Sequence, residues 1–320
     1  VIINIAKFME AYIMKWEDRR RSSNVRRGPS MNRGGFGGGG SRGPVFLPMG
    51  RGRGGLGGII FFFILMALMR GLFGIGSNLG EEQTRNEPDQ YQQQTQIEPR
   101  TNSQSNGRER LEDFLSVVLA DTEDVWNAKF EEMNATYTEP TMVPFTGSTR
   151  SACGVAQSNM GPFYCPLDES IYIDADFYNQ LVNQFGAEGD FALAYVLAHE
   201  VGHHVQNQLG ILEQTNKLRQ TLSTKEYNKY SVAQELQADY FGGLFAYYVQ
   251  EKGYLEPGDI DEAMNAAAAI GDDKIQEMSG RNVNVDTFTH GSSAQRKEAF
   301  DLGYQNHDIE HSMVFFDRIQ

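Results

Sequence analysis

The sequence has few cysteines and, outside its first 55 residues, few basic side chains. Cys153 and Cys165 are the only cysteines among 320 residues, so at most one intramolecular disulfide can form. Residues 1–55 hold 11 of the 28 Lys and Arg but only 3 of the 42 Asp and Glu, a net charge of +8. The remainder therefore carries 17 basic and 39 acidic residues, net −22. This asymmetry predicts a tail and a body in different surroundings, and the acidic body argues against nucleic acid as a partner.

Long apolar runs are also scarce. Leu56 to Ile75 is the only membrane candidate, and residues 59–69 within it are apolar without interruption. Crossing a bilayer takes about 20 residues, which requires Arg70 to lie at the exit end of the span. Nine arginines precede the run and acidic residues follow it, so the positive-inside rule predicts a cytoplasmic N-terminus and an external body. A cleaved signal peptide is the alternative.

The segments around this run lack the apolar residues of a core. Residues 1–55, rich in Gly and Arg, are expected to be a disordered basic tail, and residues 1–13 are set aside because Met14 is a more natural start. Residues 76–107 are expected to be a linker, and residues 108–320 the folded domain. Arg/Gly tails also occur in RNA-binding proteins, so a structural or nucleic-acid-interacting membrane protein is a third class of function. Between Ser22 and Gly58, the Gly- and Arg-rich part of this tail, only Phe36 and Phe46 could stack on bases.

The central motif is His199-Glu200-Val201-Gly202-His203, inside an apolar helical segment from Phe191 to Leu209. Residues four apart share a helix face, so His199 and His203 can direct two imidazoles at one point. Two neutral imidazoles suit Zn²⁺, which needs a third protein ligand and a water to form a catalytic site. Glu200 lies where its carboxylate could take the proton of that water. A solvated helix face is the alternative, but the apolar segment would bury His and Glu, which is costly without a partner.

A second helix beginning at Ser231 places Glu235 and Asp239 on one face. Glu235 would be the third zinc ligand, and Asp239 would accept the outer N–H of a ligating histidine. The helix is mostly apolar, which argues against an exposed acidic face, and Gly242-Gly243 would let it lie close to the first helix. The metzincin pattern is excluded, since Gln206 and Leu209 occupy its Gly and His positions.

Other elements follow from periodicity and turn residues. Cys153 and Cys165 flank a Gly/Pro loop, which favours a disulfide worth roughly 3 kcal/mol, with two buried thiols as the alternative. Helices are expected over residues 111–137, 176–185, 212–222, 256–269 and 294–302, with an extended segment over 141–149 and a strand over 170–174.

Several strings together resemble one family. They are LADTEDVW at 119–126, MGPFYCP at 160–166, AHEVGHHV at 198–205, ELQAD at 235–239, AIGDD at 269–273 and TFTHGSSAQR at 287–296. The Met14-Lys15-Trp16 start, the basic Gly-rich lead and the apolar run are similar too. From Met14 onward the chain resembles the bacterial neutral zinc metallopeptidase family.

The resemblance implies a membrane-anchored zinc peptidase of the gluzincin kind. Together with the charges around residues 56–75, this predicts a single-pass protein of the bacterial inner membrane whose catalytic domain lies outside the cytoplasm. The expected fold is α+β and mostly α, a zincin-like domain with a short antiparallel strand region. In zincin-type peptidases the strand ahead of the H-E-x-x-H helix, here residues 170–174, holds the substrate backbone. His290, in a late Thr-His pair, could steady the oxyanion of the tetrahedral intermediate, although a capping or packing role fits it equally well. His204, His307 and His311 are not expected to be ligands, and Arg296 is expected to pair with an acidic group.

The sequence therefore predicts a zinc-dependent endopeptidase. His199, His203 and Glu235 would bind Zn²⁺, and Glu200 would act as general base on a zinc-activated water. Its partners would be a polypeptide substrate and a membrane, with no nucleic acid. The alternative function is a catalytically inactive, membrane-tethered adaptor that binds metal and peptides without cutting them.

Overall fold

The computed structural model describes residues 14–26 and 102–319. The apolar run at 56–75 and the predicted linker up to residue 101 lie outside the described residues. Among the described residues, none of the helices has the length and apolar character needed to cross a membrane.

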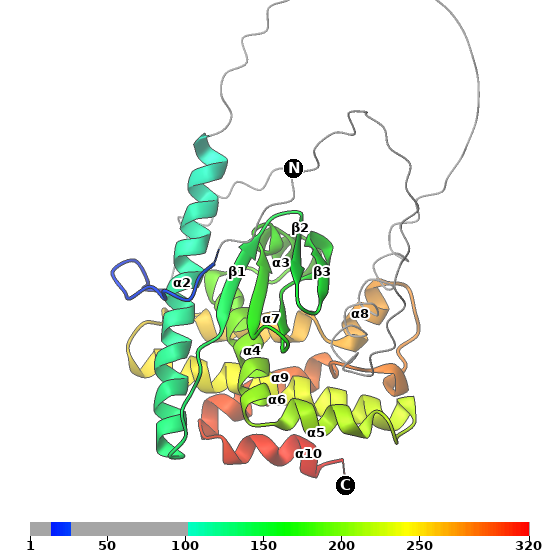
Figure 1. Ribbon diagram of the computed structural model, residues 1–320. Helices are drawn as coiled ribbons and strands as arrows, with labels where there is room; N and C mark the ends of the chain where they lie inside the picture. The colour runs from blue at the N-terminus through cyan, green and yellow to red at the C-terminus, as the bar shows by residue number, and fades with distance from the viewer. Residues whose placement is uncertain (1–13, 27–101, 320) are drawn as a thin grey trace, which may run out of the picture.

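The described residues form a mostly helical fold with a small sheet region, in agreement with the predicted α+β class (Figure 1). The helices are α2 (Asn102–Glu132), α3 (Phe177–Phe185), α4 (Asp190–Gln208), α5 (Ile211–Leu218), α6 (Thr224–Glu251), α7 (Asp259–Ala269), α8 (Asp272–Met278), α9 (Ser293–Asn306) and α10 (Val314–Asp317). The strands are β1 (Thr141–Phe145), β2 (Ser148–Ser151), β3 (Gly154–Gln157), β4 (Phe163–Cys165) and β5 (Ser170–Asp174). Short 3₁₀ turns cover Ser158–Met160, Val285–Thr287 and Glu310–Met313.

Helix α4 lies at the centre because it is apolar on almost every side. From its first residue to Gln206 every side chain is buried except that of His203, which is half-buried. A helix with this pattern must be surrounded by other elements. Helices α2, α6 and α7 pack around it, and α9 packs against α6 and α7 and reaches Tyr195 of α4 through Phe300.

Two glycines of α6 allow these close approaches. The predicted contact with the first helix is made by Gly242, where a Cβ would lie 3.1 Å from the Tyr195 ring of α4. Gly243 instead faces α9, where a Cβ would overlap the main-chain carbonyl of Phe300. The pair therefore lets α6 lie against α4 and α9 at once.

The sheet region consists of a three-stranded sheet of order β1-β5-β4 and a β2-β3 hairpin. Strand β5 pairs in parallel with β1 and antiparallel with β4, so the larger sheet is mixed, whereas the sequence predicts an antiparallel region. The prediction that the strand at 170–174 offers a free edge to a substrate is wrong, because β5 is paired on both sides. Among the described residues β1 and β4 are the two edge strands of this sheet. Val25 bridges to the outer side of β1, and β4 lies next to α4.

Residues 14–26 do not follow the prediction of a disordered tail. In the structure they pack against the body, and Met14 and Trp16 are almost completely buried. The N–H of Lys15 donates to the Tyr254 carbonyl at 2.9 Å, and Val25 forms a parallel bridge with Met142 of β1. The sequence-based prediction failed because composition was averaged over 1–55, where the Gly- and Arg-rich residues after 26 outweigh a short structured segment.

The basic residues of this segment pair with acidic residues of α2. Arg19 forms an ion pair with Asp121, and Arg20 lies 2.7 Å from both Glu123 and Asp124. Figure 1 shows the segment, in blue, crossing α2. These ion pairs hold residues 14–26 against the body.

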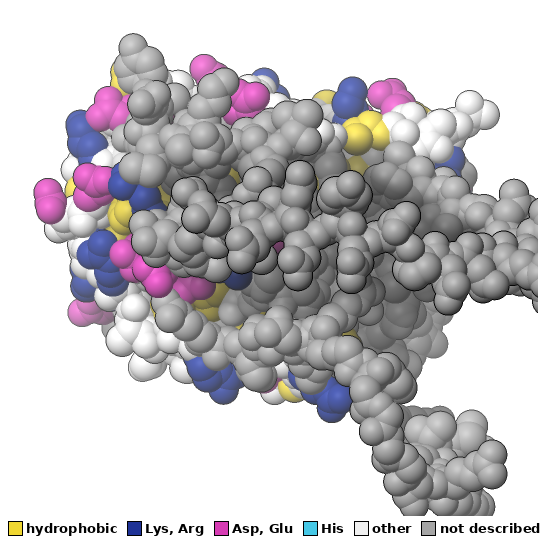
Figure 2. Space-filling model, turned by 90° about the horizontal axis from the view of Figure 1, so that it is seen from above, with side chains coloured by type: hydrophobic (Ala, Val, Ile, Leu, Met, Phe, Trp, Pro, Cys, Tyr) yellow, Lys and Arg dark blue, Asp and Glu magenta, His cyan; other side chains and the backbone are white. Residues whose placement is uncertain are grey.

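Charges of both signs are mixed over the surface. Figure 2 shows acidic and basic side chains side by side along the rim of one face of the molecule, around the atoms drawn in grey. Exposed ion pairs among the described residues include Lys217 with Glu213 and Arg318 with Glu298. Exposed pairs of this kind contribute only about 0–1 kcal/mol each to stability.

Candidate metal centre

Two helices bring the three predicted ligand residues together. His199 and His203 lie one turn apart on α4, with ring centroids 4.8 Å apart, and Glu235 comes from α6. The Nε2 atom of His199 is 3.3 Å from Oε2 of Glu235, and Nε2 of His203 is 3.4 Å from Oε1. One ligand atom from each residue lies within 4.8 Å of the other two.

The chemistry of this group fits a divalent cation. Glu235 is buried, and its Oε2 has no hydrogen-bond partner among the described residues. A buried carboxylate oxygen without a donor is costly, and a cation held between it and two imidazoles would remove that cost. Two nitrogen donors and one carboxylate oxygen form a ligand set typical of catalytic zinc sites.

The electrostatics of the three side chains point the same way. Burial raises the pKa of Glu235, but His203 and His199 outweigh it and hold that pKa well below its usual range. Burial lowers the pKa of His199, but Asp239 and Glu235 outweigh it and raise that pKa to about 10. The carboxylates thus favour positive charge at this point, which either a proton or a metal ion can supply.

Asp239 holds the outer nitrogen of His199, as the sequence predicts. Its Oδ1 lies 2.8 Å from Nδ1 of His199, so the ring donates there and presents Nε2 to the centre. Arg296 of α9 donates from Nε to Oδ2 and from Nη2 to Oδ1, both at 2.8 Å, which identifies the acidic partner predicted for it. The hydroxyl of Tyr195 donates to the same carboxylate. All of these side chains are buried, so this network fixes the His199 ring firmly.

His203 has an equivalent support that the sequence analysis missed. Its Nδ1 lies 2.9 Å from Oε1 of Gln206, one turn further along α4. The Gln206 amide donates to the Gln234 carbonyl at 2.7 Å and to Oε1 of Gln237 at 3.0 Å, both on α6. The available signal was the spacing of three between His203 and Gln206, which places an amide beside the ring.

Glu200 lies beside the two histidines and is buried. Burial raises its pKa, while His199 and His203 oppose that shift. The main-chain N–H of Tyr164 in β4 donates to its carboxylate. A buried carboxylate whose pKa is raised is suited to accept and return a proton near neutral pH.

His290 reaches the same centre from the loop before α9. It lies close enough to Glu235 to help lower the pKa of that carboxyl group. Asp272 holds it, because Oδ1 of Asp272 is 3.0 Å from Nδ1 of His290 and Oδ2 accepts the main-chain N–H groups of residues 289–291. No sequence signal pointed to this role of Asp272, since nothing in its spacing connects it with a residue 18 positions away.

The remaining histidines lie outside the centre, as predicted. His204 is fully buried and bridges the Tyr164 hydroxyl at 2.9 Å and the Thr138 carbonyl at 2.6 Å. His307 stacks on Tyr247, and His311 contacts Asp308.

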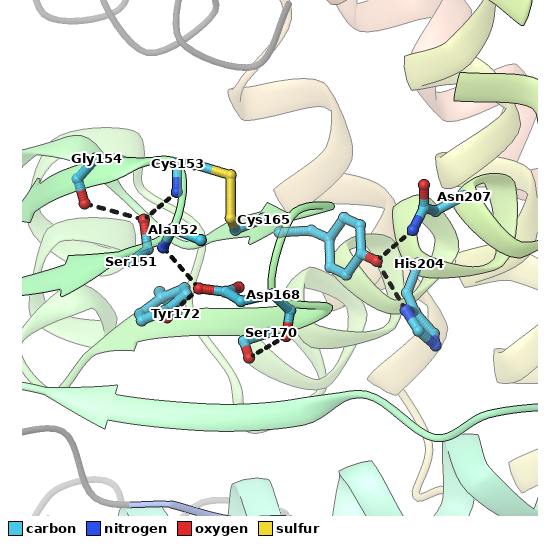
Figure 3. The surroundings of a disulfide bond; sticks show 11 residues. Ser151, Ala152, Cys153, Gly154, Cys165, Asp168, Ser170, Tyr172, His204 and Asn207 are labelled. Atoms are coloured by element: carbon cyan, nitrogen blue, oxygen red, sulfur yellow. Dashed lines mark hydrogen bonds between the residues drawn. A yellow bond between two sulfur atoms is a disulfide. The ribbon is translucent and has the colours of Figure 1, made fainter. Parts of the chain in front are cut away.

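The predicted disulfide between Cys153 and Cys165 is present. It joins the turn after β2 to the end of β4, as Figure 3 shows together with His204 and Asn207. Asp168 supports the same region, because its Oδ2 accepts the Ala152 N–H and the Tyr172 hydroxyl, both at 2.8 Å. The disulfide therefore steadies the strand whose main chain reaches Glu200.

Comparisons with known proteins point to one family. The family described as "Putative neutral zinc metallopeptidase" matches residues 14–315. "Uncharacterized protein YpfJ" of Escherichia coli strain K12 is 43% identical over 302 residues, covering 92% of this chain and 96% of its own. "Uncharacterized protein Rv2575" of Mycobacterium tuberculosis strain H37Rv is 43% identical over 206 residues, covering 61% of this chain and 69% of its own. No solved structure gives a significant match. Since the family pattern extends over nearly the whole chain, the protein belongs to this neutral zinc metallopeptidase family.

Proposed function

We propose that this protein is a zinc-dependent endopeptidase with a zincin-like active site. One observation carries the proposal. The Nε2 atoms of His199 and His203 both lie next to the buried Glu235 carboxylate, and a second buried carboxylate, that of Glu200, lies beside them. His199, His203 and Glu235 would hold the metal. When bound there, Zn²⁺ would polarise a peptide carbonyl and lower the pKa of a water molecule.

Glu200 would move the proton in this reaction. Its carboxylate would take a proton from the attacking water and later deliver it to the nitrogen of the leaving amine. The Tyr164 N–H holds the carboxylate in place. Burial raises the pKa of Glu200, so its carboxylate can accept and release a proton at a pH closer to neutral.

His290 would stabilise the negative oxygen that develops on the substrate carbonyl. Asp272 engages its Nδ1 and the surrounding main chain, so the ring is held rigidly near Glu235. A donor fixed in advance near a developing oxyanion typically contributes about 10²–10³ in rate.

Strand β4 would bind the substrate main chain. It is the edge strand beside α4, and its Tyr164 already contacts Glu200. An extended peptide added to such an edge gains affinity from main-chain hydrogen bonds with little demand on its sequence. This arrangement suits a peptidase that acts on unfolded or extended polypeptide.

Replacing Glu200 by Gln tests this function. The zinc content of Glu200→Gln should equal that of the unaltered protein, while cleavage of a denatured, fluorescently labelled protein should fall by orders of magnitude. Glu131→Gln, an exposed change on α2, is the matched control and should keep both. Undiminished cleavage by Glu200→Gln would exclude this mechanism. Zinc and peptide binding without cleavage by the unaltered protein would instead favour the adaptor.

We also propose that the body lies outside the cytoplasm of a bacterium and attaches to the membrane through residues 56–75. The disulfide supports an oxidising compartment, since such bonds rarely persist in the cytoplasm. Residues 14–26, which precede the apolar run, pack on the body, which follows it. An apolar run that enters and leaves the membrane on the same side therefore fits better than one that crosses it once. Cysteines placed at the exposed positions of Ser23 and Asp317 should then be labelled together by an impermeant reagent. Labelling of only one would contradict a shared side.

A further inference from the structure

Three carboxyl groups gather at the start of α4, away from the metal centre. Asp190 is the first residue of α4, and Asp259 and Glu262 lie in the first turn of α7. One oxygen from each lies within 4.8 Å of the other two. Gly189, with φ 106°, permits this approach, because a Cβ there would overlap the Glu262 carboxylate. The group is about 13 Å along the helix axis from His199.

Within the described residues, this group lacks the positive charge that buried carboxylates require. Asp190 and Asp259 are buried, and neither oxygen of Asp190 has a hydrogen-bond partner of ordinary geometry. Glu262 accepts the Phe191 N–H at 3.2 Å, and Asp259 accepts the Glu256 N–H at 2.9 Å, but main-chain amides carry no net charge. Burial and the neighbouring carboxylates raise the pKa of Asp190 to about 7 and that of Glu262 to about 8. The three groups therefore repel one another when ionised.

The backbone nitrogen of Met14 lies against this group. It interacts with the Asp190 carboxylate closely enough to oppose the rise in its pKa. The Met14 side chain is 1% exposed, and the hydrogen bond from the Lys15 N–H to the Tyr254 carbonyl fixes the chain direction there. A peptide nitrogen in this position offers a single donor and no charge. An α-ammonium group in the same position offers three donors and a full positive charge.

We propose that Asp190, Asp259 and Glu262 form a binding site for the α-ammonium group of Met14, in a chain that begins at that residue. The amino terminus then holds the starts of α4 and α7 together at the base of the helix that carries His199, Glu200 and His203. The family match also begins at residue 14. A divalent cation fits less well, since Ca²⁺ takes six to eight oxygen ligands and an N–H group lies against Asp190.

Comparing two forms of the chain tests this proposal. One begins at Met14, and the other carries a short Gly-Ser extension before it, which turns the ammonium into an amide. The extension should lower the melting temperature by roughly 5 °C. Asp190→Asn should lower the melting temperature of the chain that begins at Met14, because the ammonium loses its partner. In the extended chain the same change should leave it unchanged or raise it, because a repelling charge is removed.

The exposed carboxyl group of Asp261, in the same turn of α7, provides the matched control. Asp261→Asn should have no effect in either form. The proposal is overturned if the extension shifts nothing and Asp190→Asn has the same effect in both chains. Adding Ca²⁺ or Mg²⁺ to the zinc-loaded protein should not change the melting temperature. A rise in both chain forms would assign the carboxyl groups to a metal ion and overturn the proposal as well.

A second measurement does not depend on how well the extended chain folds. The pKa of the Met14 amino group, followed by its rate of acetylation against pH, should lie above its ordinary value of about 8. Glu262→Gln should bring it down again. An ordinary pKa and rapid acetylation in the folded protein would show that the amino terminus is not bound.

Discussion

Replacing Asp239 by Asn should weaken both the metal centre and the fold. The carboxylate of Asp239 is fully buried and receives His199 Nδ1 at 2.8 Å, two Arg296 N–H groups at 2.8 Å, and the Tyr195 hydroxyl. Asparagine has the same size but only one acceptor oxygen and no charge. At least one donor of this network must then face the amide NH₂.

The expected magnitude follows from the burial of Arg296, whose side chain is only 2% exposed. Removing one partner of a buried ion pair typically costs about 3–5 kcal/mol, because the other charge stays buried and uncompensated. Loss of the hydrogen bond that orients a ligating histidine typically weakens metal binding by about 10–100-fold. That range corresponds to roughly 1.4–2.7 kcal/mol.

Two assays separate these effects. Urea unfolding in the presence of a chelator reports the stability of the fold alone, and competition with a chromophoric chelator reports zinc affinity. The double variant Asp239→Leu with Arg296→Met removes both charges, so it should regain much of the stability but none of the affinity. Asp317→Asn, at an exposed carboxylate, should change neither quantity. Unchanged zinc affinity in Asp239→Asn would refute the role of Asp239 in orienting His199, and unchanged stability would refute the dependence of Arg296 on it.

Three further changes test other parts of the structure. Gly243→Ala should lower the free energy of unfolding, measured by urea titration, by about 3 kcal/mol, because its Cβ would overlap the Phe300 carbonyl. Gly202→Ala is the milder comparison: its Cβ would lie 3.1 Å from Ala238, and it should cost less than half as much. His204→Ala should cost about 1–3 kcal/mol because it removes the buried ring that bridges the Tyr164 hydroxyl and the Thr138 carbonyl, each of which keeps one other donor. The zinc content of the purified protein should not change, and loss of zinc would make His204 a ligand. Reduction of the Cys153–Cys165 bond should cost roughly 3 kcal/mol, and a melting temperature that dithiothreitol leaves unchanged would contradict this.

The geometry of the centre could be predicted where helical spacing alone determines it. His199 and His203, and likewise Glu235 and Asp239, are four residues apart, and a helix turns such pairs to one face whatever surrounds it. The apolar character of both segments then indicated that these faces are buried. Because burying such groups without partners is costly, the two faces had to meet each other or a metal.

The supports of the centre could not be predicted, because they depend on contacts between distant segments. Gln206 holds His203 only because its amide meets α6. Asp272, the first residue of α8, holds His290 although the two are 18 positions apart. The pairing of β1 with β5 likewise joins segments that are distant in sequence, and no local pattern predicts it. For this reason β5 was wrongly predicted to be an edge strand. Such contacts come from packing, and local periodicity gives no access to them.

The charges that suggested a membrane topology have a different use in the structure. Arg19 and Arg20 count toward the basic lead of the positive-inside rule, yet they pair with Asp121, Glu123 and Asp124 of α2. The positive-inside rule assumes that basic residues are free to hold one end of the chain in the cytoplasm. Arg19 and Arg20 do not meet this assumption, because acidic residues of the body neutralise them. Residues 14–26 also run from the start of α4 to the outer edge of β1, so removing them would uncover Phe114 beneath Trp16 as well as the edge of β1. The basic lead up to residue 26 is therefore part of the frame that positions the H-E-x-x-H helix, and any attachment to a membrane through residues 56–75 must leave that frame intact on one side.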